Sequence, residues 1–373
     1  MAALAAIGAT SIPVAAEAQT LLQTQARYPR IRMLATGELI ATVLLFPNDY
    51  RVRVFSSTDN GASWTAVSTF GESNWSTVQT SSPDFVVMPN GDLILGINTE
   101  THCVGCIPKI RIFRSTDKGR NWTYLSTAAT SNKAITSTDD DGFWEPNFSF
   151  DSAGNLVLIY ADETSDCCSQ KLVRVRSSDG GATWTDRSNL VAIGTSNTKE
   201  THRPGMPIVV KLTDGTDRWM LTYEVCGVAG INNCRHHYKT STDGWNYGTT
   251  TNIGTQMTGS ASRYFNGTPM VKSVQNGGPL LWIGHHLHLS DGSWSAANGY
   301  LLFRSDNGSP EGPWTAMNAP VSVDDPQSAT CDGFSPALQW VPNSSGGKNV
   351  VQMTTRLSPT GTGCDVYFGS APL

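Results

Sequence analysis

Residues 57–64 read STDNGASW, residues 115–122 read STDKGRNW, and residues 177–184 read SSDGGATW. All three fit the pattern Ser-x-Asp-x-Gly-x-x-Trp, and each follows a short strand with alternating apolar residues. In a tight turn the Asp accepts backbone N–H groups, the Gly supplies a positive φ, and the Trp packs between sheets. Two degenerate copies begin at Ser241 and Ser305, so the pattern recurs roughly every sixty residues. A repeat of this length around a hairpin turn predicts a β-propeller of four-stranded blades.

A second repeat, whose copies are offset along the chain from those of the first, predicts the number of blades. It consists of a Pro, an apolar strand, a polar or glycine turn, and a second apolar strand. Its copies begin at Pro29, Pro83, Pro146, Pro207, Pro269 and Pro336. Each copy would form the inner hairpin of a blade, while the Ser-x-Asp turn closes the outer hairpin. The sequence therefore predicts an all-β, six-bladed β-propeller.

Length and composition agree with a single propeller. The chain has 373 residues and a net charge of −5, and the repeats leave no room for a second domain. We expect one propeller domain over residues 21–373, closed by pairing of residues 365–369 near residues 20–30. Residues 1–20 are Ala-rich and are interpreted as a signal-like or disordered segment, because a small-x-small cleavage pattern occurs without a basic region before it. Neither a membrane-spanning apolar run nor a basic stripe for nucleic acid is present in the sequence.

Eight cysteines, an even number, suit a secreted, disulfide-bonded protein. Short spacings predict three pairs: Cys103–Cys106, Cys226–Cys234 and Cys331–Cys364. The adjacent Cys167 and Cys168 either bridge each other or pair elsewhere. A zinc site at Cys103 and Cys106 is the alternative, but it lacks a second ligand pair at suitable spacing. Glycosylation sequons, which suit a secreted glycoprotein, occur at Asn74, Asn121, Asn147, Asn266, Asn307 and Asn343.

One rim of the propeller is predicted to collect the functional side chains. The two strands of an inner hairpin are antiparallel, so residues near the Pro and residues ending the second strand share that rim. Aromatic, basic, acidic and amide side chains converge there, as in sugar-binding sites. The candidates for binding a sugar are Tyr28, Arg30, Trp144, Asp162, Arg203, Tyr264, Asn266 and Phe334.

Two carboxylates on this rim are candidates for catalysis. Glu145 lies in FWEPN (143–147), and Glu224 lies in LTYEVCG (221–227), one blade further on. Acidic residues are seldom buried unless they are paired or functional. Glycosidic cleavage needs two of them, one to protonate the leaving oxygen and one to stabilise or capture the oxocarbenium-like centre. Each could instead be a structural acceptor or a partner of Arg203, but two acids on one rim favour the catalytic interpretation.

The same segments resemble a known family. FWEPN, the segment HRPGMPIVVKLTDGTDRWMLTYEVCG (202–227) and the hairpin YPRIRMLATGELIATV (28–43) are similar to glycoside hydrolase family 93. The resemblance implies a sialidase-like propeller with Asp-box (BNR) repeats, and a secreted exo-α-1,5-L-arabinanase that releases arabinobiose from linear arabinan. It implies that Glu145 and Glu224 are the catalytic pair of a retaining mechanism. It also implies that Asp162, Arg203 and Arg30 help to hold the terminal sugar, and that no metal or organic cofactor takes part.

The likeness weakens beyond residue 250. The family has a functional tyrosine late in the chain. Tyr264 is a candidate for it here, whereas Phe334 in its place would be a loss. For partners we expect a polysaccharide or oligosaccharide substrate, neither nucleic acid nor membrane, and a monomer.

Three alternatives remain open from the sequence. A true sialidase would hold a substrate carboxylate with three arginines, for which Arg30, Arg203 and either Arg263 or Arg356 are available, although the contexts of Glu145 and RPGMP argue against it. A propeller polysaccharide lyase would act on a uronate and use His285 or His286 as the base. A non-catalytic glycan-binding propeller would tolerate the loss of either Glu.

Overall fold

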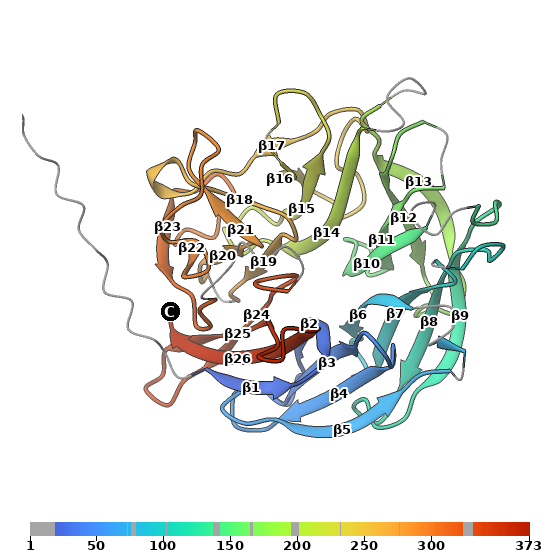
Figure 1. Ribbon diagram of the computed structural model, residues 1–373, viewed down its shortest axis with the longest axis horizontal. Coiled ribbons are helices and arrows are strands. Elements are labelled where there is room, and N and C mark those ends of the chain that lie inside the picture. Colours follow the sequence, from blue (N-terminus) through green and yellow to red (C-terminus); the bar gives the residue numbers. More distant parts are fainter. Residues whose placement is uncertain are drawn as a thin grey trace, which may run out of the picture.

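The computed structural model describes residues 19–373, apart from residues 73, 76–79, 102, 137–141, 165–166, 195–200, 232, 276 and 324–330. Within these residues the strands form six antiparallel sheets, arranged as a ring around a central axis (Figure 1). The prediction of an all-β, six-bladed propeller is therefore confirmed. The expected N-terminal segment, residues 1–20, lies outside the described residues except for Gln19 and Thr20. None of the described helices is long and apolar enough to cross a membrane.

The first three blades each consist of four consecutive strands. Blade one contains β2 (Ala26–Met33), β3 (Leu39–Leu45), β4 (Val52–Ser57) and β5 (Thr65–Phe70). Blade two contains β6 (Ser81–Val87), β7 (Leu93–Thr99), β8 (Lys109–Ser115) and β9 (Thr123–Thr130). Blade three contains β10 (Phe143–Phe150), β11 (Leu156–Asp162), β12 (Lys171–Ser177) and β13 (Thr185–Val191).

The last three blades are less regular. Blade four contains β14 (Arg203–Lys211), β15 (Trp219–Cys226), β16 (Arg235–Ser241) and the short β17 (Thr255–Gln256). Its sheet is extended by β18 (Tyr264–Asn266) and β21 (His286–His288), which follow the 3-10 turn η1 (Ser260–Ser262). Blade five contains β19 (Met270–Ser273), β20 (Leu280–Ile283), β22 (Leu301–Ser305) and β23 (Trp314–Asn318). Blade six contains β24 (Ala337–Pro342), β25 (Lys348–Leu357), β26 (Cys364–Pro372) and β1 (Thr20–Gln23).

The ring is closed by strands from both ends of the chain. Strand β1 pairs with β26, and Thr20 lies opposite Phe368, so the predicted closure is confirmed (Figure 1). The Ser-x-Asp turn joins the third and fourth strands of a blade. Because blade six takes its fourth strand from the N-terminal segment, it needs no such turn. This explains why the turn pattern has five copies and the Pro hairpin has six.

The Ser-x-Asp turns lie at the outer edge of the blades and stabilise them locally. Asp117 accepts hydrogen bonds from the backbone N–H of Asn121 (2.8 Å) and from Oγ of Ser115 (2.8 Å). These bonds, led by the one from the Asn121 N–H, lower the pKa of Asp117 to about 2. Gly119 has the positive φ of 83° that the turn needs. Trp122 stacks on Phe70 of the preceding blade, with ring centroids 5.0 Å apart, so the turn also helps to join two blades.

The hydrophobic core lies between neighbouring blades. Every residue of β3, β7 and β11 is buried, because the second strand of a blade is covered on both faces. One cluster combines Val52 and Val54 of blade one with Phe85 and Leu95 of blade two. Each sheet is therefore held by its two neighbours, and the inner strands are fixed around the axis.

Four disulfides join all eight cysteines. The predicted pairs Cys103–Cys106, Cys226–Cys234 and Cys331–Cys364 are confirmed. The sequence left the pairing of Cys167 and Cys168 open, and the structure joins them to each other.

Candidate active site

The inner strand of every blade has the same irregularity at the same end. The residue before each repeat Pro has a left-handed backbone, with φ of 59° at Tyr28, 52° at Ser82, 57° at Glu145, 53° at Met206, 46° at Thr268 and 49° at Ser335. In blades one to four the register of the inner hairpin shifts at this position. A non-glycine residue in this region costs on the order of 1–3 kcal/mol, and such strain clusters at functional sites. We call these six residues the axial ring.

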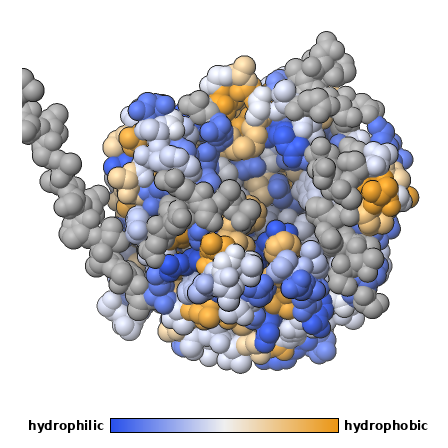
Figure 2. All heavy atoms as spheres, in the orientation of Figure 1, coloured by the Kyte–Doolittle hydropathy of each residue, from blue (hydrophilic) through white to orange (hydrophobic). Residues whose placement is uncertain are grey.

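Side chains of the axial ring meet across the channel. Oη of Tyr28 lies 3.8 Å from Sδ of Met206, although the two residues come from blades one and four on opposite sides of the ring. Oγ1 of Thr268 accepts the backbone N–H of Ser335 (3.1 Å), and Nη1 of Arg30 donates to Oγ of Ser335 (3.0 Å). The face in Figure 2 is hollowed at the centre of the ring of blades. The repeat therefore brings one residue from every blade to a single end of the channel.

Glu145 and Glu224 lie on either side of Gly205. A Cβ atom at Gly205 would be 3.3 Å from Oε2 of Glu145 and 3.4 Å from Oε1 of Glu224, so these two oxygens are no further apart than the sum of the two distances. The separation of the carboxyl groups in retaining glycosidases, about 5–5.5 Å, falls within that limit. Both side chains are only half-buried, so a substrate can reach them.

The two carboxyl groups influence each other's protonation. Burial is the main cause that raises the pKa of Glu145, and the neighbouring charge of Glu224 raises it further. Burial also raises the pKa of Glu224. Each group accepts one backbone N–H, from Met206 at 2.5 Å and from Thr268 at 2.8 Å, which opposes the rise. Two close carboxyls of this kind retain a shared proton near neutral pH, so one can act as an acid while the other is a carboxylate.

A polar network surrounds the carboxylate pair. Arg203 begins β14, and its guanidinium contacts Glu163 and donates to Gln170 Oε1 (3.1 Å). Its positive charge lowers the pKa of both Glu145 and Glu224, in opposition to burial. Trp144 donates from Nε1 to Glu163 (2.5 Å), which places its half-exposed ring beside the network. Arg203 is therefore a cation whose charge acts on both catalytic candidates.

Asp162 and Glu163 have different surroundings although they are adjacent in sequence. Asp162 is buried and accepts hydrogen bonds from Arg187 (2.8 Å) and from the backbone and side chain of Thr164. Glu163 contacts Trp144 and Arg203 instead. Glu163, and not Asp162, therefore contacts Arg203, whereas Asp162 is bonded to Arg187 of the outer strand β13; sugar binding by Asp162 stays a prediction.

The other predicted sugar-binding residues fall into two groups. Tyr28, Arg30 and Phe334 lie at the axial ring: the Arg30 guanidinium is 4.0 Å from the centre of the Tyr28 ring, and the ring of Phe334 is 6.4 Å from that of Tyr28. Tyr264 and Asn266 contact His288 instead, Tyr264 by stacking at 5.5 Å and Asn266 through a hydrogen bond of 3.0 Å. No interaction links either of these two with the carboxylate pair among the described residues.

Sequence reasoning missed four residues that build the site: Gly205, Gln170, Thr268 and Ser335. Thr268 and Ser335 could have been found, because each precedes the Pro of its repeat, the position that Glu145 occupies in blade three. In the sequence, Gly205 stands out only as a member of the RPGMP segment that resembles the family. Its role depends on carboxylates from two other strands, for which there is no local signal.

One group of potential metal ligands is found among the described residues, and it combines Glu224 with Cys226 and Cys234. The two sulfurs form a disulfide, so this group offers a single carboxylate.

No protein-family model matches the chain, and no curated protein matches it in sequence. Solved structures do match. The alpha-L-arabinanase of Penicillium chrysogenum, in complex with arabinobiose, has a TM-score of 0.73 at 21% identity and covers 93% of this chain and 94% of that chain. The alpha-L-arabinofuranosidase of Fusarium graminearum, from glycoside hydrolase family 93 and also with arabinobiose, has a TM-score of 0.73 at 18% identity, with 93% of each chain covered. A Hadza microbial sialidase has a TM-score of 0.58 at 12% identity and covers 94% of this chain and 66% of that chain. At such identities the likeness shows a shared fold.

Proposed function

We propose that this protein is an exo-acting glycoside hydrolase that uses a retaining two-carboxylate mechanism. We further propose that it acts on linear α-1,5-L-arabinan and releases arabinobiose. The observation that carries the proposal is that Glu145 and Glu224 both approach Gly205, with one oxygen 3.3 Å and the other 3.4 Å from a Cβ atom placed there, which is compatible with the spacing of a retaining pair. The choice of arabinan is supported by the two similar structures that were solved with arabinobiose.

In this mechanism Glu145 is the nucleophile and Glu224 is the acid and base. Glu224 protonates the leaving oxygen while a carboxylate oxygen of Glu145 bonds to the anomeric carbon and the glycosidic bond breaks. Glu224 then takes a proton from water, which attacks the same carbon and releases Glu145 and the sugar. Each carboxyl accepts one backbone N–H, so these hydrogen bonds do not distinguish the nucleophile from the acid and base. The assignment therefore depends on the rescue experiment described below.

Arg203, Glu163 and Trp144 form the wall that would hold the terminal sugar. Charged hydrogen-bonding groups beside an aromatic ring suit a sugar, which presents hydroxyl groups and apolar faces. Arg30 would contribute from the axial ring, where it donates to Oγ of Ser335.

The arginines favour a neutral sugar over a sialic acid. Arg30 donates to Ser335 and the carbonyl of Pro29, and its Nε is 3.7 Å from Asp84. Arg203 is engaged by Glu163 and Gln170. Both guanidinium groups therefore already interact with acceptors of the protein, which leaves fewer of their N–H donors for a substrate carboxylate.

Secretion is part of the same proposal. Four disulfides persist most readily in an oxidising compartment, as outside the cell.

The test is to incubate the protein with linear arabinan, sialyl-lactose and a uronate polymer, and to analyse the products. We expect arabinobiose from arabinan and no product from the other two. Glu145→Gln and Glu224→Gln should each reduce turnover by several orders of magnitude, while Glu38→Gln, in the turn between β2 and β3, should retain it. Sialic acid release, an unsaturated uronate product, or binding without cleavage would each identify one of the alternative functions.

The roles of the two acids are assigned with azide. In Glu145→Ala, azide should give a glycosyl azide of inverted configuration. In Glu224→Ala, it should give one of retained configuration, because the covalent intermediate still forms. Near-normal turnover in both variants would disprove the paired-carboxylate mechanism.

A further inference from the structure

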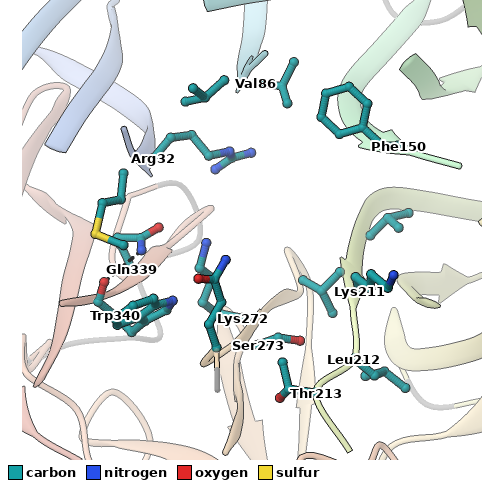
Figure 3. Close-up of a pocket in the computed structure, with 15 residues that line it drawn as sticks. Arg32, Val86, Phe150, Lys211, Leu212, Thr213, Lys272, Ser273, Gln339 and Trp340 are labelled. Carbon is teal, nitrogen blue, oxygen red and sulfur yellow. Dashed lines mark hydrogen bonds between the residues drawn. The ribbon is translucent and has the colours of Figure 1, made fainter. Parts of the chain in front are cut away.

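A cavity of about 450 Å³ opens at the other end of the channel (Figure 3). It is lined by the far ends of the inner strands, including Arg32, Phe150, Lys272 and Trp340. The inner strands all begin at the axial ring, and Arg32 follows Tyr28 by four residues. At roughly 3.3 Å per residue the cavity therefore lies about 13 Å along the strand from the ring. It is separate from the carboxylate pair.

The lining of this cavity is cationic. Arg32 and Lys272 come from blades one and five, and Figure 3 shows both charged ends pointing toward the centre of the cavity. Lys211 adds a third cation and pairs with the exposed Asp217 (2.7 Å). Lys272 makes no hydrogen bond or ion pair with any residue that the structure describes. The cavity thus contains an ammonium group that no direct ion pair or hydrogen bond engages within the described residues, although the charge of Asp84 acts on it.

Asp84 is the carboxylate whose charge raises the pKa of Lys272, but its hydrogen bonds go to other groups. Its side chain is fully buried and accepts hydrogen bonds from Arg32 (2.8 Å), Asn147 (2.8 Å) and the N–H of Phe85 (2.8 Å). Burial lowers the pKa of Lys272 to about 7, and the charge of Arg32 contributes to the decrease. A bound anion would remove this unfavourable interaction between two cations.

Other groups suit a ligand larger than a bare ion. Oγ of Ser273 is buried in the lining without a hydrogen-bond partner among the described residues. Trp340 supplies apolar surface, and a second cavity of about 550 Å³ shares Met33, Gln275 and Trp340 with the first. Small-molecule sites occupy about 300–1,000 Å³, whereas one water takes about 30 Å³. The space fits a monosaccharide.

We propose that this cavity binds a monosaccharide-sized molecule that carries an oxyanion, such as a sugar acid. The oxyanion lies between Arg32 and Lys272. The ring of the sugar packs toward Trp340. The site does not depend on the proposed hydrolysis, because none of its residues contacts Glu145 or Glu224.

The proposal is tested by calorimetric titration of the intact protein at pH 6 and low ionic strength. The probes are D-galacturonate, its neutral counterpart D-galactose, and inorganic phosphate. The affinity for galacturonate should exceed the affinity for galactose by about tenfold or more, because the neutral sugar lacks the charged hydrogen bonds. Tighter binding of galacturonate than of phosphate supports a sugar acid as the ligand, whereas binding of phosphate alone overturns the proposal of a monosaccharide-sized ligand.

The variants locate the site. Lys272→Gln should weaken galacturonate and phosphate binding about tenfold or more. Lys118→Gln, at an outer turn, should leave binding unchanged, and so should Glu145→Gln, because the site lies apart from the catalytic candidates. The proposal is overturned if neither anion binds, if galactose binds equally well, or if Lys272→Gln binds as the wild type does. Should Lys272→Gln fail to fold, Lys211→Gln decides, because it removes another cation of the lining: it weakens binding of both anions if the proposal holds and has no effect if it does not.

Discussion

Replacing Glu224 with Gln should lower the pKa of Glu145. The Gln keeps the shape of the side chain and removes its negative charge, which is the second cause of the raised pKa of Glu145. Two unit charges about 6 Å apart interact by roughly 2.8 kcal/mol at an effective dielectric constant of about 20. That energy corresponds to about a hundredfold change in proton affinity. Burial remains in the variant, so the pKa of Glu145 should fall but stay above its ordinary value.

The assay is a pH titration by NMR of protein with ¹³C-labelled glutamate carboxyl groups. The Glu145 signal is assigned by its absence in Glu145→Gln. Glu163→Gln should produce a smaller decrease, because Glu163 has a weaker influence on Glu145 than Glu224 has. Glu38→Gln is the matched control and should change nothing, since Glu38 pairs with Lys118 at an outer turn. An unchanged pKa of Glu145 in Glu224→Gln would refute the pairing of the two acids.

Three further predictions concern stability and the shape of the site. Both acids have a raised pKa in the folded state, so the stability they contribute is present below their unfolded pKa and is lost as the pH rises through the folded pKa. Glu145→Gln should therefore melt at a higher temperature than the wild type at pH 9 but not at pH 4, and equal melting curves at pH 9 would contradict the burial argument. Gly205→Ala should reduce hydrolysis by about tenfold or more with the fold intact by circular dichroism, because its methyl group would lie 2.5 Å from Nε2 of Gln170, which must move, and 3.3 Å and 3.4 Å from the two carboxylates. Full activity would show that the site tolerates this displacement and that substrate does not enter this space. Asp117→Ala should reduce the free energy of unfolding, measured by chemical denaturation, by about 1 kcal/mol, because it removes hydrogen-bond acceptors of an outer turn. Hydrolysis should stay unchanged, and a loss of activity would place that turn at the site.

The blades could be predicted because their signals are local and periodic. A turn such as the one at Asp117 forms from residues within a few positions of each other, so its chemistry is visible in the sequence. The Pro hairpins repeat the same pattern six times, and the number of copies equals the number of blades. The closure by β1 follows from the same count, since the last blade lacks an outer turn.

The candidate acids could be predicted from their place in the repeat. Glu145 stands directly before a repeat Pro, and Glu224 stands near the end of the second strand of the next hairpin. Antiparallel pairing brings these two positions to one rim in any blade. The rim was therefore predictable, while the separation of the carboxyl groups was not, because it depends on how Gly205 lets two blades approach.

Sequence by itself thus determined the six blades, the outer turns, three of the disulfides and the rim on which Glu145 and Glu224 lie. Only the tertiary structure decided that Glu163 rather than Asp162 contacts Arg203, and that Arg32 and Lys272 share a cavity. The physical reason is the distance along the chain over which each interaction acts. Turn chemistry and strand alternation act over a few residues, whereas the direction of a side chain at a strand end and the meeting of two distant cations are fixed by the packing of whole blades around the axis.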